Sequence, residues 1–336
     1  MKKKAFITGI SGMDGENLSK HLLSLDYEVH GTIRRHSVSE SQESRISDVK
    51  GIQTYYADMS ETTVLEKLLR EIQPDEIYHL AAMSHVKVSW DIPAFTLNTN
   101  GCGTLNLLEA YRNNSPKSKF YFAASSECFG LTVDENGYQN ENTIMNPTSV
   151  YGCSKVLGYN LTRHYRRAYG LHACCGILFN HTGIGRGSNF AEAKIVKTAC
   201  MIKLGLADKL ELGNLDSYRD FGASKDYVKG MVKILNHHAA DDFVLATGKT
   251  YSMRQVCEIV FSYLDMDYRD YVIQNPKYLR PEELPYLIGD SSKARREVNW
   301  EPEYTFEKIV REMCDHWIDK LANESKIVLK DKLFGA

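Results

Sequence analysis

Short apolar runs alternate with helical patterns through the first half of the chain. In the helical patterns, apolar residues recur every three or four positions, as one face of an amphipathic helix requires. The predicted strands cover residues 5–8, 27–33, 53–57, 76–80, 119–124 and 173–179, and the clearest helices cover 17–25, 63–72 and 103–112. Strands separated by helices pair in parallel through right-handed crossovers. The pattern therefore predicts an α/β fold with a doubly wound parallel sheet.

The pattern changes after Asn180. Residues 181–189 are rich in glycine and polar side chains and predict a loop, whereas residues 193–206 predict a helix. One face of a C-terminal helix is marked by Phe306, Ile309, Val310, Met313 and Trp317. We expect a first domain over 1–180, joined by a later segment near 213–245, and a smaller mixed lobe that takes up most of 181–336.

A glycine-rich turn joins the first strand to the first helix. Its sequence is GISGMDG over residues 9–15, so the glycines are spaced G-x-x-G-x-x-G. Such glycines allow a tight turn and a close approach of a pyrophosphate to the helix N-terminus. The turn predicts a Rossmann-type dinucleotide site formed by Gly9, Gly12, Met13, Asp14 and Gly15.

The second strand ends in Arg34 and Arg35, where a site for NAD would usually carry an acidic residue that accepts from the ribose 2′-hydroxyl. Guanidinium groups instead favour a 2′-phosphate, which predicts NADP. A solvated basic turn is the alternative. Residues at the ends of the third and fourth strands are expected on the same binding face: Asp58, Met59, Leu80, Ala81 and Ala82.

Tyr151 and Lys155 are four residues apart and share one face of a predicted helix. A nearby ammonium stabilises a phenolate, so we expect Lys155 to lower the pKa of Tyr151 and make it a usable acid and base. The preceding strand ends at Ser125, whose hydroxyl can bind the same substrate oxygen as the tyrosine. Tyr-x-x-x-Lys is common by chance, but its place behind this strand makes it specific.

Composition removes several other classes of function. The chain is 43% hydrophobic and has a formal charge of −2, so it has the material for a large core and no broad basic field for nucleic acid or an anionic membrane. None of the eight cysteines forms a metal-binding pattern, and free thiols suit a reducing cytosol. No apolar run is long enough to span a membrane. We therefore expect a cytoplasmic protein with no metal site.

At this point the sequence resembles the GDP-mannose 4,6-dehydratase family of the extended short-chain dehydrogenase/reductase superfamily. The resemblance covers nearly the whole chain. It rests on TGISGMDG at 8–15, GTIRR at 31–35, SHVK at 84–87, SE at 126–127, YGCSK at 151–155, ILFNH at 177–181, RGSNF at 186–190, LGNLD at 212–216, RD at 219–220, KDYV at 225–228, RPEE at 280–283 and GD at 289–290.

The resemblance implies a 4,6-dehydration. Tyr151, with Ser125 and Lys155, would serve oxidation at C4, and Glu127 would remove the C5 proton and then help the C6 oxygen leave. A helix-start carboxylate is the alternative role for Glu127. The resemblance also places His181 and Arg186 with the cofactor, and it gives the implied substrate contacts as Met83, Ser84, Ser126, Asn180, Asn189, Lys194, Gly213, Arg219, Arg280 and Glu283.

Three departures from the family pattern bear on the sugar. Ser125 stands where threonine is usual, and Met83 stands where glutamine is usual, next to a loop at 182–186 that also differs. A flexible thioether accommodates a larger C6 substituent than an amide that holds a hydroxymethyl group. With the resemblance, these departures lead us to expect GDP-mannose or GDP-D-glycero-D-manno-heptose as the substrate.

Other possibilities stay open from the sequence. A nucleotide-sugar epimerase or a 4-keto-sugar reductase would use the same tyrosine and lysine without needing Glu127. A non-catalytic NADP-sensing protein of this fold is a third, less favoured reading, because such proteins commonly lose one of that pair. The family resemblance implies a homodimer or homotetramer. The polar insertion at residues 36–45 either reaches a neighbouring subunit or forms a surface loop.

Overall fold

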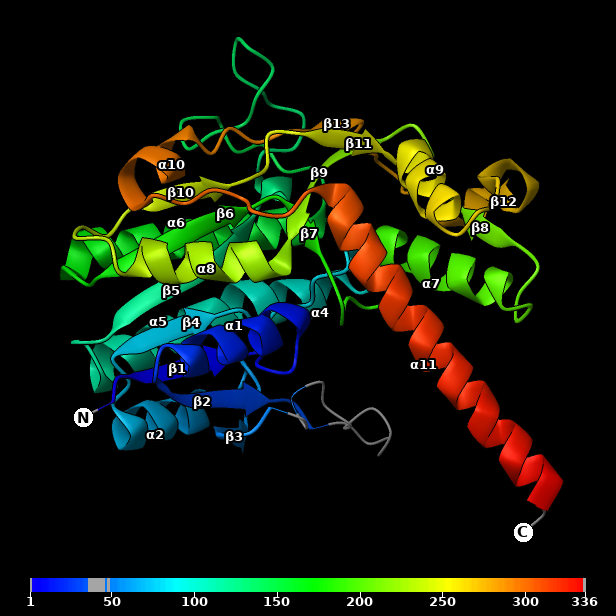
Figure 1. Cartoon of the computed structure of the whole chain (residues 1–336). Coiled ribbons are helices and arrows are strands. Elements are labelled where there is room, and N and C mark those ends of the chain that lie inside the picture. Colours follow the sequence, from blue (N-terminus) through cyan, green and yellow to red (C-terminus); the bar gives the residue numbers. More distant parts are fainter. Residues whose placement is uncertain (1, 36–45, 47–48, 335–336) are drawn as a thin grey trace.

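A seven-stranded, wholly parallel sheet forms the centre of the protein (Figure 1). The computed structural model describes residues 2–35, 46 and 49–334. The strands run in the order β3-β2-β1-β4-β5-β6-β10. Their bounds are β1 Lys4–Thr8, β2 Glu28–Ile33, β3 Ile52–Tyr56, β4 Glu76–His79, β5 Lys119–Ser125, β6 Ala173–Leu178 and β10 Asp242–Leu245.

The predicted fold class is confirmed, and the six strands expected from the first half all belong to this sheet. The seventh strand, β10, was not predicted as a strand, because four residues are too few to show a hydrophobic period. The strand order changes direction between β1 and β4: β2 and β3 extend the sheet on one side of β1, and β4, β5, β6 and β10 extend it on the other. Ligands of doubly wound sheets bind at such a switch point, beyond the carboxyl ends of the strands.

Helices cover both faces of the sheet (Figure 1). On one face lie α1 (Met13–Ser24) and α8 (Ser224–Leu235), which pack against each other. The opposite face carries α2 (Thr62–Ile72), α5 (Gly103–Asn114) and α6 (Val150–Tyr169). Helix α1 begins four residues before the predicted 17–25, because its first turn holds glycine and acidic residues that show no apolar period.

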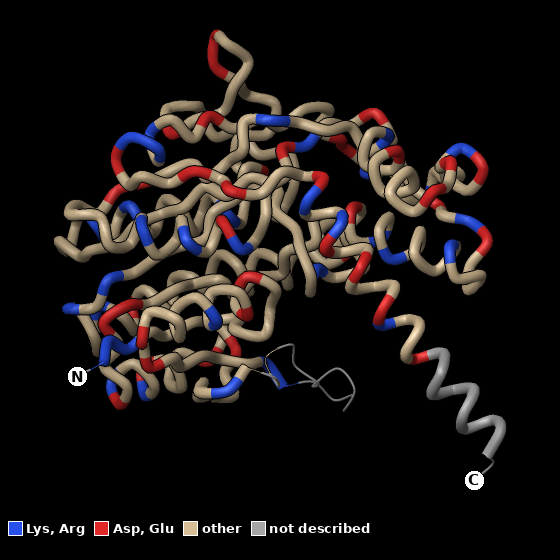
Figure 2. Tube along the Cα trace, viewed as in Figure 1, with Lys and Arg blue, Asp and Glu red and all other residues tan. Residues whose placement is uncertain are grey.

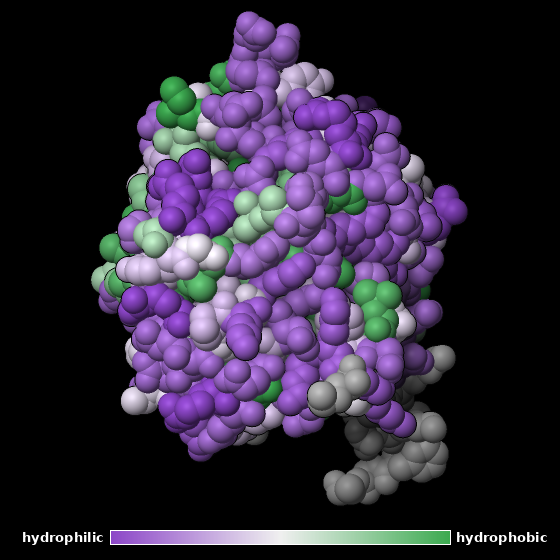
Figure 3. Space-filling view, turned by 90° about the vertical axis from the view of Figure 1, so that its left-hand side faces the viewer, coloured by the Kyte–Doolittle hydropathy of each residue, from purple (hydrophilic) through white to green (hydrophobic). Residues whose placement is uncertain are grey.

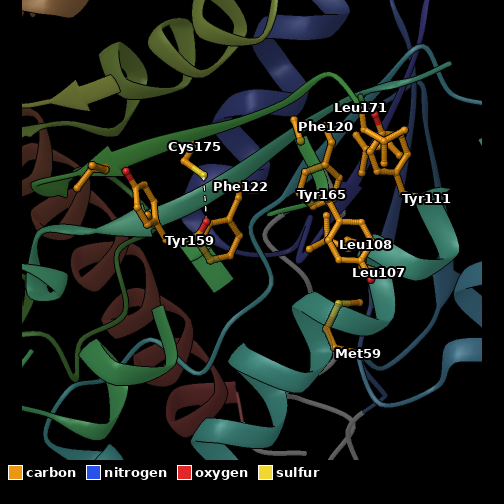
Figure 4. Packing of buried hydrophobic residues seen from close by; sticks show 14 of the residues in the cluster. Met59, Leu107, Leu108, Tyr111, Phe120, Phe122, Tyr159, Tyr165, Leu171 and Cys175 are labelled. Carbon is orange, nitrogen blue, oxygen red and sulfur yellow. Dashed lines mark hydrogen bonds between the residues drawn. The ribbon is translucent and has the colours of Figure 1, made fainter. Parts of the chain in front are cut away.

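Aromatic and aliphatic side chains fill the space between the sheet and α5 and α6 (Figure 4). Tyr111 stacks on Phe120 with ring centroids 5.4 Å apart. A Cβ atom on Gly158 of α6 would come within 2.4 Å of the Phe122 ring, so this glycine lets α6 lie close to β5. The Tyr159 hydroxyl donates to the Asp242 carboxylate at 3.0 Å, which ties α6 to β10. These contacts fix the helix that carries Tyr151.

A smaller lobe follows β6. Its four-stranded sheet contains β7 (Asn180–Thr182), β9 (Tyr218–Ala223), β11 (Thr250–Ser252) and β13 (Tyr286–Leu287), and β8 (Leu210–Leu212) pairs with β12 (Val272–Gln274). Helices α7 (Ala191–Lys203), α9 (Met253–Tyr263) and α11 (Phe306–Phe334) share its core. The prediction of a loop over 181–189 is wrong at its start, because β7 includes residues 181 and 182. A strand of three residues is too short to show alternating hydrophobic and polar positions.

Short elements complete the described chain. They are α3 (Val88–Asp91), α4 (Pro93–Leu97), the π-helical turn η2 (Asn98–Cys102), the 3₁₀ turns η3 (Ser126–Cys128), η4 (Tyr268–Asp270) and η5 (Pro276–Tyr278), and α10 (Ser292–Val298). Among them, η2 and η3 matter most for the site, because they bring polar residues to the carboxyl ends of β4 and β5.

The surface agrees with the near-neutral composition. Lysines and arginines are interspersed with acidic residues along the described chain (Figure 2), and the face turned to the viewer in Figure 3 is mainly hydrophilic. All eight cysteines are free; six are buried, and Cys102 and Cys153 are exposed. Within residues 2–35, 46 and 49–334, no helix is long and apolar enough to cross a membrane.

Candidate active site

A cavity of about 1050 Å³ lies at the carboxyl ends of β1, β4 and β5, between the sheet and the smaller lobe. It is lined by all the site residues predicted above except Arg35. Residues that are far apart in the sequence are thus brought to one chamber. Its volume is at the upper limit of the range for ligand pockets, about 300–1,000 Å³.

The glycine turn has the geometry that close approach of a ligand requires. Gly9 has φ +71°, and a Cβ atom there would lie 2.8 Å from the Ala81 Cα atom. A Cβ atom on Gly15 would lie 2.4 Å from the Ile10 carbonyl oxygen. Helix α1 starts immediately after Gly12, so its first backbone N–H groups have no partner within the helix. The turn therefore presents donors and a positive helix end to the cavity.

Asp14 holds the start of α1 against the smaller lobe. Its carboxylate accepts from the Ser224 hydroxyl at 2.6 Å and contacts His181 Nε2 at 2.7 Å. Burial alone raises the pKa of Asp14, but the charge and hydrogen bond of His181 and the hydrogen bond from Ser224 bring it below its ordinary value. Arg186 pairs with Glu192 at 2.8 Å. Asp14 and His181 thus position the turn in addition to lining the cavity.

The far end of the cavity, beyond β2 and β3, is lined by Arg34, Asp58 and Met59. The Arg34 guanidinium lies 5.9 Å from the centre of the Phe95 ring, which also lines the cavity. The Asp58 carboxylate accepts from the backbone N–H and the hydroxyl of Ser60. Arg35 is exposed and does not line the cavity, so the structure places one arginine of the pair, not both, at this end.

Tyr151, Lys155 and Ser125 meet at the middle of the cavity. The Ser149 side chain caps α6 by accepting from the Gly152 N–H at 3.0 Å, so Tyr151 lies in the first turn. A Cβ atom on Gly152 would lie 2.7 Å from the Glu127 carbonyl oxygen, which shows how closely α6 packs on η3. Ser125 is the last residue of β5, and its hydroxyl shares a hydrogen bond with the Tyr151 phenol.

The expected effect of Lys155 on Tyr151 is wrong for this geometry. Burial raises the pKa of Tyr151 above its ordinary range, and the Ser125 hydrogen bond and the charge of Arg186 only partly oppose it. Lys155 Nζ instead donates to the Ala123 carbonyl at 2.8 Å and lies 6.0 Å from the centre of the Tyr151 ring. Burial lowers the pKa of Lys155 to about 8. Spacing on the helix placed the two residues together but did not show where the ammonium would bond.

Glu127 lies in η3 and is buried, with its side chain 9% exposed. Its carboxylate is 3.6 Å from Arg280 Nη1, and the same Nη1 atom is 3.7 Å from the Glu283 carboxylate. Glu283 accepts from Arg219 Nη2 at 2.8 Å. Two acidic and two basic side chains therefore alternate along one wall of the cavity, next to Tyr151.

The wall formed by the smaller lobe carries the other predicted substrate residues. Asn180 Oδ1 is buried and has no hydrogen-bond partner within the described chain. Lys194 Nζ donates to the Glu211 carbonyl at 2.6 Å and lies 3.7 Å from the centre of the Tyr278 ring. A Cβ atom on Gly213 would lie 2.8 Å from the Tyr278 carbonyl oxygen. A buried acceptor without a partner among the described residues and an ammonium line the same cavity, which is consistent with a polar ligand.

The strand-end segment 81–84 is held by a residue that the sequence reasoning missed. Asn100, in the π-helical turn η2, accepts from the Met83 N–H at 2.8 Å and donates to the Met83 carbonyl at 3.0 Å. Its amide also donates to the Ser154 hydroxyl, one helical turn from Tyr151. No local pattern marks a π-helical turn, so only the fold reveals this link. Tyr278, Phe95 and His85 are further lining residues that were not predicted, and His85 Nε2 contacts the carbonyl oxygen of the predicted residue Asn189 at 3.0 Å.

Comparison with known proteins agrees with this geometry. The sequence matches the family described as GDP-mannose 4,6 dehydratase over residues 6–313. It is 41% identical to GDP-mannose 4,6 dehydratase 2 of Arabidopsis thaliana, over 98% of this chain and 90% of that protein. It is 38% identical to GDP-mannose 4,6 dehydratase of Homo sapiens, over 92% of this chain and 90% of that protein.

Solved structures support the fold. RMD from Pseudomonas aeruginosa complexed with NADPH superposes with a TM-score of 0.79 at 24% identity, covering 95% of this chain and 99% of that one. dTDP-glucose 4,6-dehydratase from Bacillus anthracis in complex with NAD superposes with a TM-score of 0.81 at 21% identity, covering 95% and 97%. Both neighbours hold a nicotinamide cofactor on this architecture.

Proposed function

We propose, because the chain belongs to the GDP-mannose 4,6-dehydratase family, that it removes water from a GDP-linked sugar of manno configuration and yields the 4-keto-6-deoxy product. The observation that carries the proposal is that Ser125, Glu127, Tyr151 and Lys155 line one cavity together with the glycine turn. An epimerase or a reductase needs no base such as Glu127. Its presence beside Tyr151 favours the dehydratase, a lyase.

The cavity fits a nicotinamide dinucleotide. The close approach of Gly9 to Ala81 leaves no room for a side chain at this turn, which lines the cavity, and the N-terminus of α1 offers N–H donors for a pyrophosphate. We infer that NADP is held by the glycine turn, by the strand-end residues and by Arg34. The glycine turn contributes Gly9, Gly12, Met13, Asp14 and Gly15, and the strand ends contribute Asp58, Met59, Leu80, Ala81 and Ala82. When bound, NADP would accept a hydride from C4 of the sugar and later return it to C6.

Oxidation at C4 uses Tyr151 as the proton acceptor. The Tyr151 oxygen takes the proton of the sugar 4-hydroxyl as the C4–H bond breaks. The Ser125 hydroxyl, which already bonds the phenol, also binds the C4 oxygen and favours the phenolate. The positive charge of Arg186 also favours the phenolate, whereas burial and the neighbouring Cys128 and Glu127 oppose it.

Elimination then uses Glu127. The new C4 ketone acidifies the C5 proton, which Glu127 takes as a carboxylate base. The C6 oxygen leaves as water with that proton, so Glu127 acts first as base and then as acid. Its position in a buried turn that packs on the first turn of α6 supports this role, because it brings the carboxylate and the phenol to one region of the cavity.

The substrate class is tested by incubating the protein with NADP and GDP-, UDP- or dTDP-linked hexoses, followed by mass spectrometry. We expect loss of one water from the GDP-linked manno sugar without added reductant. A product of unchanged mass would show an epimerase instead, and no turnover of any sugar would contradict the proposal.

NADP preference is expected to depend on Arg34. A charge-assisted bond to a 2′-phosphate contributes about 1.5–3 kcal/mol, roughly tenfold or more in affinity. Arg34→Ala should therefore weaken NADP binding at least about tenfold more than NAD binding, measured by fluorescence titration. Arg35→Ala is the matched control and should change the ratio much less, because Arg35 does not line the cavity. Equal binding of NADP and NAD by the unmodified protein would contradict the prediction.

We expect the protein to convert a heptose at least as readily as a hexose. Met83 lines the cavity, and its backbone is fixed by Asn100 while its thioether keeps rotational freedom. Without a designed hydrogen bond, the pocket separates substrates by only about 1–3 kcal/mol per added carbon. We expect kcat/KM for GDP-D-glycero-D-manno-heptose to be comparable with, or above, that for GDP-mannose, and Met83→Gln to shift the ratio toward GDP-mannose. A hundredfold preference of the unmodified protein for GDP-mannose would overturn this.

A homodimer or homotetramer is expected. Exposed apolar side chains gather where α4 meets α6: Ile92 is 40% exposed, Leu97 41% and Leu157 38%. Leu97 and Leu157 both lie beside Gly101, so they belong to one patch. Sedimentation should show a species larger than the 38.2 kDa monomer, and Leu157→Glu should dissociate it. A monomer at micromolar concentration would contradict the prediction.

The insertion at 36–45, which was expected to reach a neighbouring subunit or form a surface loop, lies outside the described residues.

Two wider proposals follow from the same premise. Residues 1–180, with α8 and β10, would hold the cofactor, and the rest of 181–336 would hold the nucleotide sugar. We also propose a cytoplasmic location, since eight free cysteines suit a reducing compartment.

A further inference from the structure

Arg280 lies between two carboxylates and is hydrogen-bonded to neither. Its Nη1 atom is 3.6 Å from Glu127 and 3.7 Å from Glu283, beyond hydrogen-bond distance in both directions. Its side chain is 26% exposed, toward the cavity that it lines. Arg280 is therefore a guanidinium that makes no hydrogen bond within the described residues, and it lines the cavity where a ligand would bind.

The neighbouring arginine is bonded in a different way. Arg219 Nη1 donates to the carbonyl oxygens of Tyr218 and Leu284, and Nη2 donates to Glu283 at 2.8 Å. Its side chain is 6% exposed. Arg219 thus holds Glu283 in place, and Arg280 is the cation of the wall that has no hydrogen bond to either carboxylate. Within the described residues, the ion pair of the Glu127 carboxylate is with Arg280, while the charge of Glu127 also partly offsets the lowering of the Arg219 pKa by burial.

We propose that Glu127 and the diphosphate of the substrate compete for Arg280, so that binding of the nucleotide frees the base. This inference rests on the function proposed above. Guanidinium groups bind phosphate oxygens in bidentate fashion, more tightly than a carboxylate held at 3.6 Å. A diphosphate therefore draws the guanidinium away from Glu127.

Movement of Arg280 toward the diphosphate would change the transfer of a proton to Glu127. A cation beside a carboxylate opposes transfer of a proton onto it, because the neutral acid no longer attracts the cation. With Arg280 on the diphosphate, Glu127 meets the C5 proton with the nearer of its two neighbouring cations drawn away, and Arg219 stays bonded to Glu283. The C5–H bond breaks, the proton goes to Glu127, the electron pair passes toward the C4 ketone, and the C6 oxygen then leaves with the proton as water. Arg280 so links nucleotide binding to the elimination step.

Competition makes a prediction about binding that needs no turnover. Glu127→Gln removes the competing charge, so GDP should bind more tightly, by at least about fivefold, the lower end of usual coupling between sites. Arg280→Gln should weaken GDP binding about tenfold or more. In the Arg280→Gln background, Glu127→Gln should change GDP affinity less than about twofold. Calorimetric titration of GDP into the full chain with NADP bound measures all four proteins.

Three controls make the result specific. Glu135→Gln removes an exposed carboxylate outside the cavity lining and should leave GDP affinity unchanged. Arg280→Lys keeps a cation and serves if Arg280→Gln does not fold; the gain from Glu127→Gln should persist in it. NADP affinity, measured in each variant, should not change.

If Glu127→Gln also tightened GDP binding in the Arg280→Gln background, the charge of Glu127 would act on GDP directly. That result would overturn the proposed competition for Arg280. No gain in Glu127→Gln overturns it as well. Both outcomes leave GDP binding by the unmodified protein intact and so leave the proposed function standing. Failure of GDP to bind the unmodified protein would overturn the proposed function and this inference together.

Discussion

Replacing Glu127 with glutamine is expected to stop the loss of water while sparing oxidation at C4. The amide keeps the shape of the side chain but cannot accept the C5 proton, and a positioned acid/base contributes about 10²–10⁴-fold to a rate. The variant should therefore form NADPH and a 4-keto sugar, seen by absorbance and mass spectrometry, and it should incorporate solvent deuterium at C5 poorly. Dehydration should fall by about 10³-fold.

Glu135→Gln is the matched control for that result, because Glu135 is exposed and does not line the cavity. Its activity should equal that of the unmodified protein. Full dehydratase activity in Glu127→Gln would remove Glu127 from its role and would reopen its interpretation as a carboxylate that only starts a helical turn.

Replacing Tyr151 with phenylalanine is expected to stop the reaction earlier, before any NADPH forms. The ring still fills its buried position, so folding and KM should change little, but the 4-hydroxyl proton then has no acceptor. We expect kcat to fall by about 10²–10⁴-fold. Stopped-flow absorbance should show no NADPH burst, in contrast to Glu127→Gln, and the two variants together order the steps.

Tyr138→Phe serves as the control for the loss of a phenol oxygen, since Tyr138 is 37% exposed and outside the cavity lining. It should retain full activity. An undiminished NADPH burst in Tyr151→Phe would show that another group takes the 4-hydroxyl proton.

The parts of the site that the sequence predicted are those encoded within one turn or one strand end. The glycine turn and the Tyr151–Lys155 pair lie at fixed spacing on adjacent elements, and the strand periodicity of the sheet places them at its carboxyl edge. Local spacing suffices there, because crossovers in parallel sheets have a fixed hand.

The parts that the sequence did not predict depend on contacts between distant segments. The ion pair of Glu127 with Arg280 joins η3 to the loop before β13, and the link from Asn100 to Met83 depends on a π-helical turn. The raised pKa of Tyr151 depends on burial, which spacing does not reveal. Arg34 and Arg35 are neighbours in sequence, yet only Arg34 lines the cavity.

The central claim is that the chain dehydrates a GDP-linked manno sugar by moving one hydride from C4 to C6. It is tested most directly with a substrate carrying deuterium at C4, a catalytic amount of NADP and no added reductant, with the product examined by mass spectrometry and NMR. The account predicts a product that has lost one water, carries the deuterium on C6, and leaves NADP oxidised. A product that keeps its mass, or a 6-deoxy sugar without deuterium at C6, would contradict it.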